Sequence, residues 1–205
     1  MPPYDALEKM ARLADRVRGH RQDRLPSLIA MTDPKRTPDP LLLARHLPQG
    51  SAIIYRHFGF PDRFDIGNLL AKICRKRGLV LLVSADPVLA ETIKADGIHW
   101  PEKNFGQAVR LRARKKSDLF TISAHTPDAA LRANSAGFDG ILYSSIFDSK
   151  SPSAGRSHGA FAASAIAQKT STPLFALGGV NQYTAKRLIG LGFSGIACVG
   201  AVSFG

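Results

Sequence analysis

Short, almost continuously apolar runs recur along the chain and alternate with longer segments whose apolar residues fall at helical spacing. Continuous apolar runs are typical of strands that are buried on both faces, as the strands of a parallel sheet are. Eight such runs are predicted to be strands: Ser27–Thr32, Ala52–Arg56, Leu79–Ser84, Gly97–Trp100, Leu119–Ser123, Gly140–Ser144, Leu174–Leu177 and Gly195–Val199.

The segments between the predicted strands carry the residues that begin and end helices. Asp86 and Thr126 each precede a proline, so each places a capping side chain before a residue suited to the first helical turn. Helices are predicted at Asp65–Arg77, Pro87–Ala95 and Asn181–Leu191 and from Thr126 to Gly137, most of them ending at a glycine.

Repeated strand–helix units either close into a barrel or form an open, doubly wound sheet. No G-x-G-x-x-G sequence opens a helix after any predicted strand, which disfavours a dinucleotide-binding open sheet. We therefore predict an α/β fold, a single (β/α)₈ TIM barrel over residues 25–205. Barrels of this kind begin at roughly 200 residues, so the connections must be short and no second domain is expected.

Residues 4–18 are predicted to form a further, amphipathic helix, with Leu7, Met10, Ala14 and Val17 on one side. Because eight helices would already cover the sides of a barrel, we expect residues 1–24 to be an N-terminal helical extension. The apolar stripe would then close the bottom of the barrel or meet another subunit, as in a homodimer.

The formal net charge of +12 comes from 28 basic and 16 acidic residues. Part of this charge is clustered, in residues 12–24 and 110–116. A basic balance suits an anionic partner, such as a phosphorylated metabolite, a nucleic acid or an acidic membrane. We expect a small phosphorylated substrate rather than nucleic acid, because no aromatic side chains that could stack on bases interleave the second cluster.

The sequence also bears on the cellular compartment. No apolar run approaches the roughly 18 residues that span a bilayer, and no signal-peptide core opens the chain. No membrane partner is therefore expected. Cys74 and Cys198 stand far apart and in no metal-binding or redox spacing. We expect a cytoplasmic protein.

In such barrels the site lies at the carboxyl ends of the strands, and phosphate is commonly bound after strands seven and eight. Gly178 and Gly179 follow the seventh predicted strand and precede Asn181, an expected helix N-cap, while Gly200 follows the eighth. Glycines let backbone N–H groups approach an anion closely, and a helix N-terminus favours negative charge. We predict that phosphate binds at these three glycines; the alternative is a tight strand-to-helix turn.

Two further side chains at the strand ends suit chemistry on an anionic substrate. His125 follows the fifth strand and is predicted to act as a general acid or base, the alternative being a histidine hydrogen-bonded in the rim. Arg56 ends the second strand and suits a bidentate contact with an anion, or else an ion pair with Asp33 or Asp86. His99 lies lower in its strand and is expected to be structural.

Six short motifs, in order along the chain, resemble those of the thiamine phosphate synthase/TenI superfamily. They are Met31–Thr32–Asp33, Ala95–Asp96–Gly97–Ile98–His99, Ile122–Ser123–Ala124–His125–Thr126, Gly137–Phe138–Asp139–Gly140, Leu177–Gly178–Gly179–Val180 and Gly195–Ile196–Ala197. The resemblance runs from about residue 27 to about residue 203 and implies the same barrel fold.

The resemblance implies two related activities on thiazole phosphate. A synthase of this family joins a pyrimidine diphosphate to thiazole phosphate and releases pyrophosphate, with Mg²⁺ and basic residues holding the diphosphate. A thiazole tautomerase of the same superfamily only moves a proton, and its histidine aligns with His125. The resemblance also implies that hydroxyl and lysine side chains bind substrate or phosphate, at Ser84, Ser123, Ser149, Lys150 and Ser151.

The sequence departs from the family where Mg²⁺ and the diphosphate would bind. The two metal carboxylates correspond to Ala85 and Asn104, and of a Gln-x-Arg-x-Lys motif only Arg56 is kept, with Ile54 and Phe58 beside it. Mg²⁺ is held by carboxylates and substrate phosphates, so no metal ion and no other cofactor are expected here. Losing the metal should slow the synthase reaction on the order of 10²–10⁴-fold.

Three functions are compatible with these observations. The first is an enzyme of the thiamine pathway that acts on thiazole phosphate without Mg²⁺, with His125 as acid and base. The second is a barrel that binds a phosphorylated ligand without catalysis. The third is a basic protein that associates with nucleic acid through its arginine clusters.

Overall fold

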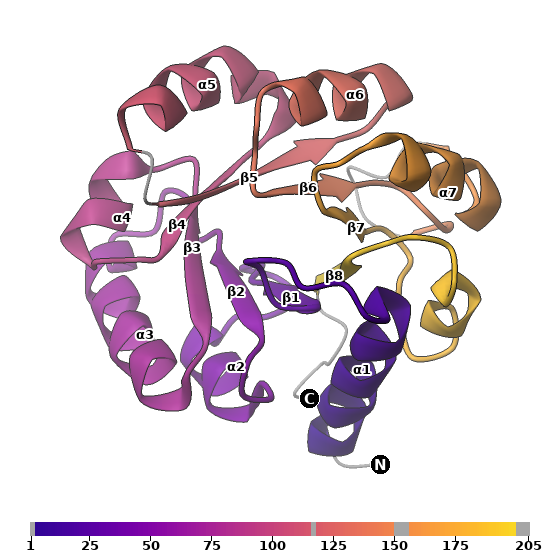
Figure 1. Cartoon of the computed structure of the whole chain (residues 1–205). Coiled ribbons are helices and arrows are strands. Elements are labelled where there is room, and N and C mark those ends of the chain that lie inside the picture. The colour runs from indigo at the N-terminus through magenta and orange to yellow at the C-terminus, as the bar shows by residue number, and fades with distance from the viewer. Residues whose placement is uncertain (1–2, 116–117, 150–155, 200–205) are drawn as a thin grey trace.

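The computed structural model describes residues 3–115, 118–149 and 156–199 (Figure 1). Within them the strands pair in parallel and in sequence order to form a closed barrel, in which β8 pairs with β1. The strands are β1 (Leu28–Met31), β2 (Ala52–Tyr55), β3 (Val80–Ser84), β4 (Gly97–Trp100), β5 (Leu119–Ala124), β6 (Gly140–Tyr143), β7 (Leu174–Ala176) and β8 (Gly195–Val199). The predicted TIM barrel and its eight strands are confirmed.

The inside of the barrel is filled by side chains at alternate positions of the strands. Ile29, Ile54, Leu82 and Phe175 belong to one buried apolar cluster there, and none is more than marginally exposed. Leu25, in the segment before β1, belongs to the same cluster and contacts the start of β6. The lower half of the barrel is therefore a packed core, which leaves space for a ligand only at the carboxyl ends of the strands.

Helices surround the barrel as the caps in the sequence predict. They are α2 (Pro40–His46), α3 (Arg63–Arg77), α4 (Pro87–Thr92), α5 (Phe105–Arg114), α6 (Pro127–Ser135) and α7 (Ala160–Lys169), with a 3₁₀ turn η1 (Glu102–Asn104) before α5. The Asp86 and Thr126 side chains accept hydrogen bonds from backbone N–H groups in the first turns of α4 and α6. Gly78 ends α3 in the left-handed conformation.

The helix predicted at Asn181–Leu191 is wrong. That segment contains only a short 3₁₀ helix, η2 (Ala185–Leu188). The Asn181 side chain accepts hydrogen bonds from the N–H groups of Tyr183 and Thr184, so it closes a local turn that competes with an α-helix. Gly190 and Gly192 then adopt positive φ angles, which an α-helix cannot contain.

The N-terminal helix α1 (Pro3–Arg18) lies on the side of the barrel, against β8, β1 and η2, and Figure 1 shows it in the ring of helices. Leu7, Met10, Ala14 and Val17 are buried there. The expectation that this stripe closes the bottom of the barrel or meets another subunit is therefore wrong. Because η2 is too short to cover β8, α1 covers it instead. The apolar stripe of α1 therefore no longer argues for a homodimer, which stays a prediction.

Side-chain hydrogen bonds fix the end of α1 to the barrel. The Arg18 guanidinium donates to the carbonyl oxygen of Ser194, just before β8, at 2.9 Å and to that of Leu25 at 2.6 Å. These contacts join the first helix to the last strand. None of the helices described is long and apolar enough to cross a membrane.

We predict that Met10→Ala lowers the free energy of unfolding by about 2–5 kcal/mol, because Met10 is 1% exposed and its removal leaves a cavity between α1 and the barrel. Urea denaturation followed by circular dichroism measures this change. Glu8→Ala, on the exposed side of the same helix, is the control and should change stability by less than ~0.5 kcal/mol. Equal effects of the two substitutions would contradict the burial of α1.

Candidate active site

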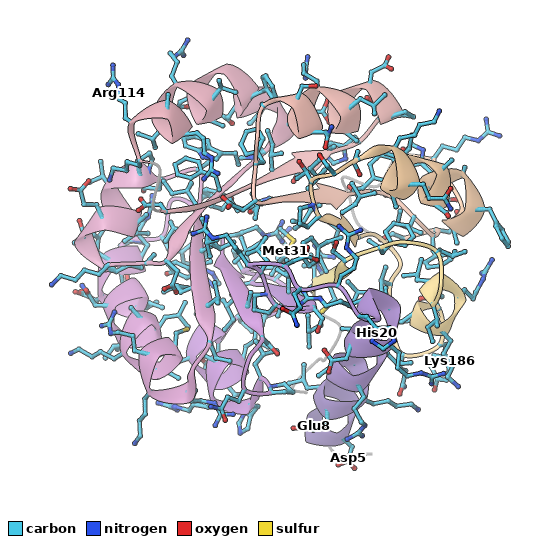
Figure 2. All side chains as sticks on the ribbon, viewed as in Figure 1. Asp5, Glu8, His20, Met31, Arg114 and Lys186 are labelled. Carbon is cyan, nitrogen blue, oxygen red and sulfur yellow. The ribbon has the colours of Figure 1, made fainter. Side chains whose placement is uncertain are left out.

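A cavity of about 480 Å³ opens at the carboxyl ends of the strands. Met31, whose label lies at the centre of the ring of helices in Figure 2, is one of its apolar lining residues. Seven of the predicted site residues line it together: Arg56, Ser84, Ser123, His125, Ser149, Gly178 and Gly179. Lys150, Ser151 and Gly200 lie outside the described residues. So do residues 150–155 of the long segment Ile146–His158, rich in Ser, Lys, Arg and Gly, which the sequence predicts to close over His125.

His125 lies at the mouth of the cavity and is held by contacts with three other elements. Its backbone N–H donates to the Glu102 carboxylate at 2.7 Å, and its carbonyl oxygen lies 3.0 Å from His158 Nε2. In the ring, Nδ1 lies 3.1 Å from the Ser144 hydroxyl oxygen. The other ring nitrogen, Nε2, has no hydrogen-bond partner within the described ranges. The imidazole is therefore oriented through Nδ1, while Nε2 remains available to a ligand in the cavity.

His158 gives this arrangement a rigid support. Its ring stacks on that of Tyr143, with 4.9 Å between the centroids, and its backbone N–H donates to the carbonyl oxygen of Ser145. The residue that contacts the His125 backbone is thus itself fixed by β6 and the loop that follows it. The alternative interpretation, that His125 is a hydrogen-bonded residue of the rim, agrees with the contact between Nδ1 and Ser144. It assigns no role to Nε2.

His99 lies in the wall of the cavity and is almost fully buried. Its Nδ1 is 2.9 Å from the Thr121 hydroxyl oxygen, and its Nε2 is 3.0 Å from that of Ser123. Burial, with a smaller contribution from the positive charge of Arg56, lowers the pKa of His99 to about 3. A neutral imidazole with this pKa is a poor base near pH 7, so His99 serves to fix the Ser123 hydroxyl, in line with the expected structural role.

Gly178 and Gly179 follow β7 with φ angles of 88° and 65°. A Cβ atom on Gly178 would lie 2.8 Å from Ser145 Cα, and one on Gly179 would lie 2.5 Å from the Asp148 carbonyl oxygen. The loop after β6 therefore packs directly on this glycine pair, and Phe147 N–H donates to the Gly178 carbonyl at 3.0 Å. From the sequence, glycine was expected here only because it lets an anion approach the backbone. The close packing of the loop after β6 is a second reason for glycine, which the sequence did not reveal.

The phosphate prediction at this loop needs one correction. Since no α-helix begins at Asn181, the helix-dipole part of the argument is wrong. The backbone part is unaffected, because Gly178, Gly179 and Val180 line the cavity and their N–H groups have no acceptor in the part of the chain that the structure describes. Three successive N–H groups without an acceptor among the described residues are donors available to an anion in the cavity.

Arg56 lines the cavity and is ion-paired with Asp33, as one of the two interpretations from the sequence has it; its contact with an anion stays a prediction. Its Nε donates to the Thr32 carbonyl at 2.8 Å. Arg36, from the loop after β1, pairs with the same Asp33 oxygen at 3.0 Å and lines the cavity too. Sequence reasoning missed Arg36 because it considered only residues directly at strand ends. The signal available in the sequence was that Arg36 stands three residues after Asp33, a spacing at which the two side chains can form an ion pair.

The pKa of Asp33 reflects these contacts. Burial alone would raise it, but hydrogen bonds from the Arg36 side chain and from the backbone N–H groups of Arg36 and Lys35, with the charge of Arg36, lower it to about 2. Asp33 is therefore ionised throughout the neutral range and keeps both guanidinium groups in place.

The positions that the resemblance assigns to Mg²⁺ carry no carboxylate. Ala85 has a methyl group, and the Asn104 amide donates to Gln107. Asp86, one residue away, is fully engaged, because one of its oxygens caps α4 and the other pairs with Arg63. Among the described residues no group of three or more His, Cys, Asp or Glu side chains could hold a metal ion. The residues present do not fit a carboxylate-bound Mg²⁺.

A family model described as Thiamine monophosphate synthase matches residues 29–202. The chain belongs to this family. It is 30% identical over 185 residues to a thiamine-phosphate synthase of Chlorobium phaeobacteroides, a match that covers 87% of this chain and 88% of that protein. It is 29% identical over 141 residues to the thiamine biosynthesis bifunctional protein ThiED of Geobacter sulfurreducens, of which it spans 29%.

A solved structure extends the comparison to the fold. Thiamine phosphate pyrophosphorylase from Pyrococcus furiosus matches with a TM-score of 0.75 at 22% identity, covering 94% of this chain and 90% of that one. The family resemblance inferred from six short motifs is thus confirmed, and with it a family of thiamine biosynthesis.

We predict that Asp33→Asn destabilises the protein in a pH-dependent way. Because folding lowers the pKa of Asp33 from 3.8 to about 2, its ionised form contributes stability that is fully present above pH ~4 and is lost as pH falls through about 2. The difference in unfolding free energy from the unsubstituted protein should be on the order of 2 kcal/mol at pH 6 and should shrink towards pH 2. Urea denaturation at several pH values measures it. A deficit that is the same at every pH would show that the charge of Asp33 is not the cause.

Proposed function

We propose that this protein is an enzyme of thiamine biosynthesis that binds thiazole phosphate and moves a proton on it with His125, without Mg²⁺-dependent synthase turnover. One observation carries the proposal: free backbone N–H groups at Gly178–Val180 and the unpartnered Nε2 of His125 share one cavity within the described residues. A phosphate donor surface and an acid/base group are the two parts that proton transfer on a phosphorylated ring requires.

The phosphate would accept hydrogen bonds from the backbone after β7, which leaves the ring to extend into the cavity. Ser123, fixed by His99, and Ser84 offer hydroxyl groups along its walls, while Met31, Leu177 and Val199 supply apolar surface. The cavity volume of about 480 Å³ is in the range of small-molecule sites. The ligand would thus be held at its phosphate end by backbone hydrogen bonds and along its length by hydroxyl and apolar contacts.

His125 would give and take the proton through one nitrogen. The Ser144 hydroxyl beside Nδ1 can either donate or accept, so it holds the imidazole in either tautomer. With Nδ1–H donating to the Ser144 oxygen, the neutral ring accepts the proton from one ring position of the ligand at Nε2 and becomes an imidazolium. The imidazolium then returns a proton from Nε2 to the second position and is neutral again, and a positioned acid/base group contributes typically 10²–10⁴-fold to such a step.

The synthase reaction requires neutralisation of the diphosphate charge, for which the residues of this cavity are poorly suited. A leaving diphosphate carries several negative charges, which a divalent cation usually neutralises. Here Ala85 and Asn104 stand at the metal positions, and the two arginines that line the cavity already share Asp33. This charge balance supports a ligand with fewer negative charges than the synthase substrates carry together.

A phosphate-binding barrel without catalysis is the second candidate, and one observation favours it. The His125 side chain is exposed, so bulk water would compete for its proton unless bound ligand covers it. The nucleic-acid hypothesis has less support. Arg18, Arg24 and Arg112, from the two basic clusters, donate hydrogen bonds to other residues of the chain, the latter two to Asp139, although the Arg24 side chain is exposed.

We predict that His125→Asn lowers the rate of proton exchange on thiazole phosphate by 10²–10⁴-fold and changes the affinity of the protein for thiazole phosphate by less than about threefold. Deuterium exchange followed by NMR gives the rate, and calorimetry gives the dissociation constant. Ser144→Ala, which removes only the group that orients the ring, should lower the rate less. Equal losses of rate and affinity would identify His125 as a ligand contact. Binding without any exchange in the unsubstituted protein would favour the non-catalytic barrel.

We also predict synthase turnover 10²–10⁴-fold below that of ordinary family members with Mg²⁺ in excess. The double substitution Ala85→Asp, Asn104→Asp should raise it and make it depend on Mg²⁺. Ala85 has a φ of 50°, a conformation that Asp tolerates better than most residues, so the restored carboxylate is compatible with the backbone. Ordinary turnover by the unsubstituted protein would refute the loss of the diphosphate site.

A further inference from the structure

The main chain on both sides of His125 is hydrogen-bonded to other parts of the molecule. Before it, the Ala124 carbonyl oxygen accepts from Ser144 N–H at 3.0 Å. The His125 N–H itself donates to the Glu102 carboxylate at 2.7 Å, and the His125 carbonyl oxygen accepts from His158 Nε2 at 3.0 Å. Both peptide units that meet at the His125 Cα atom are therefore held in place.

These contacts matter because His125 is exposed and directly follows β5. An exposed side chain ordinarily turns between its rotamers within nanoseconds, since few neighbours limit it. The contact of Nδ1 with Ser144 orients the ring only while the Cα–Cβ bond that carries the ring keeps one direction. The direction of Nε2 in the cavity therefore depends on the main chain of His125.

Glu102 and His158 reach His125 from two separate elements. Glu102 begins η1, after β4, and His158 stands one residue before Gly159, the N-cap of α7. Neither is among the described residues that line the cavity. Both are thus placed to act on a ligand only through His125.

His158 is itself fixed by the end of β6 and the residues that follow. Its ring lies at 18° to the Tyr143 ring on which it stacks. Its backbone N–H donates to the Ser145 carbonyl at 2.8 Å, and the next N–H, that of Gly159, donates to the Ile146 carbonyl at 3.0 Å. The donor that holds the His125 carbonyl therefore has a defined position of its own.

The contact with the His125 carbonyl also determines which nitrogen of His158 carries a proton. A carbonyl oxygen only accepts hydrogen bonds, so His158 Nε2 must be protonated. Nε2–H is present in one neutral tautomer and in the imidazolium form, so the contact persists when the charge of His158 changes. In this contact His158 is a donor and not a base.

We propose that His158 and Glu102 are positioning residues, which fix the main chain of His125 and thereby the direction of its Nε2. The inference rests on the proposed function, since this direction affects a rate only if Nε2 exchanges a proton with the ligand. A misplacement of about 1 Å can cost on the order of 10²-fold in rate. Loss of either contact should therefore slow proton transfer, whereas phosphate binding, which uses the backbone after β7, should be unchanged.

The first test separates the N–H donor of His158 from its ring. His158→Phe keeps a ring that can stack on Tyr143 but has no donor, so we expect kcat for proton exchange on thiazole phosphate to fall by ~10–100-fold. The dissociation constant should change by less than about twofold. His158→Gln places an amide N–H as many bonds from Cα as Nε2 and should recover most of the loss. His20→Phe, at an exposed histidine just after α1, is the control and should change neither quantity.

A matched pair of substitutions tests Glu102 in the same assay. Glu102→Ala removes the acceptor of the His125 N–H and should lower kcat by ~10–100-fold. Glu102→Gln keeps an amide oxygen that accepts from this N–H, so its loss should be clearly smaller. Equal losses of kcat in the two variants of Glu102, or in His158→Phe and His158→Gln, would overturn the proposal.

A second measurement needs no activity. Three-bond NMR couplings of isotopically labelled histidine show whether the Cα–Cβ torsion of His125 is fixed or averaged, and His125→Asn identifies its signal among the six histidines. We expect one rotamer in the unsubstituted protein and averaging in His158→Phe; unchanged couplings in that variant would refute positioning. If the unsubstituted protein exchanges no proton, the proposed function fails, and the couplings still test the position of His125.

Discussion

β1 and β8 pair in parallel through four residue pairs, from Leu28 with Ile196 to Met31 with Val199, and this ladder closes the sheet on itself. In a closed parallel barrel every strand points its carboxyl end at the same opening. Residues that are far apart in the sequence, from Met31 to Val199, therefore meet around one cavity. The packed lower half, filled by residues such as Ile54 and Phe175, confines the polar groups to that opening.

The polar groups at the opening divide into parts with different physical properties. Between β4 and β6 stand imidazole and hydroxyl groups, with His99 kept neutral by burial and His125 in contact with water. After β7 the backbone itself supplies donors, and on the β1–β2 side charge dominates, through Arg36, Arg56 and Asp33. A ligand that fills the cavity would contact all three parts, which is a stricter requirement than phosphate binding alone.

Sequence patterns predicted the features that depend on local physics. Continuous apolar runs located all the strands, and the caps Asp86 and Thr126 located helix starts, because both signals act within a few residues. His125, Arg56 and Ser123 were assigned to one site because each lies at the end of a predicted strand, and the structure places all three around the cavity. The family followed from short motifs that the family match later confirmed.

The errors arose where distant residues decide the outcome. The position of α1 depends on how little of β8 is covered by η2, which no local pattern contains. The need for Gly178 and Gly179 depends on the close approach of Ser145 and Asp148 from another loop. Arg36 reaches the cavity through its pairing with Asp33, in a loop whose path the sequence did not predict.

The contact between Arg18 and the carbonyl of Ser194 joins residues 176 positions apart, and it has a consequence for the growing chain. The helix that covers β8 is synthesised long before that strand. At about 5–20 residues per second, its apolar face would wait roughly 10–40 s on the ribosome before β8 emerges. The barrel therefore closes only after β8 has emerged, and until then the apolar face of α1 has no strand to cover.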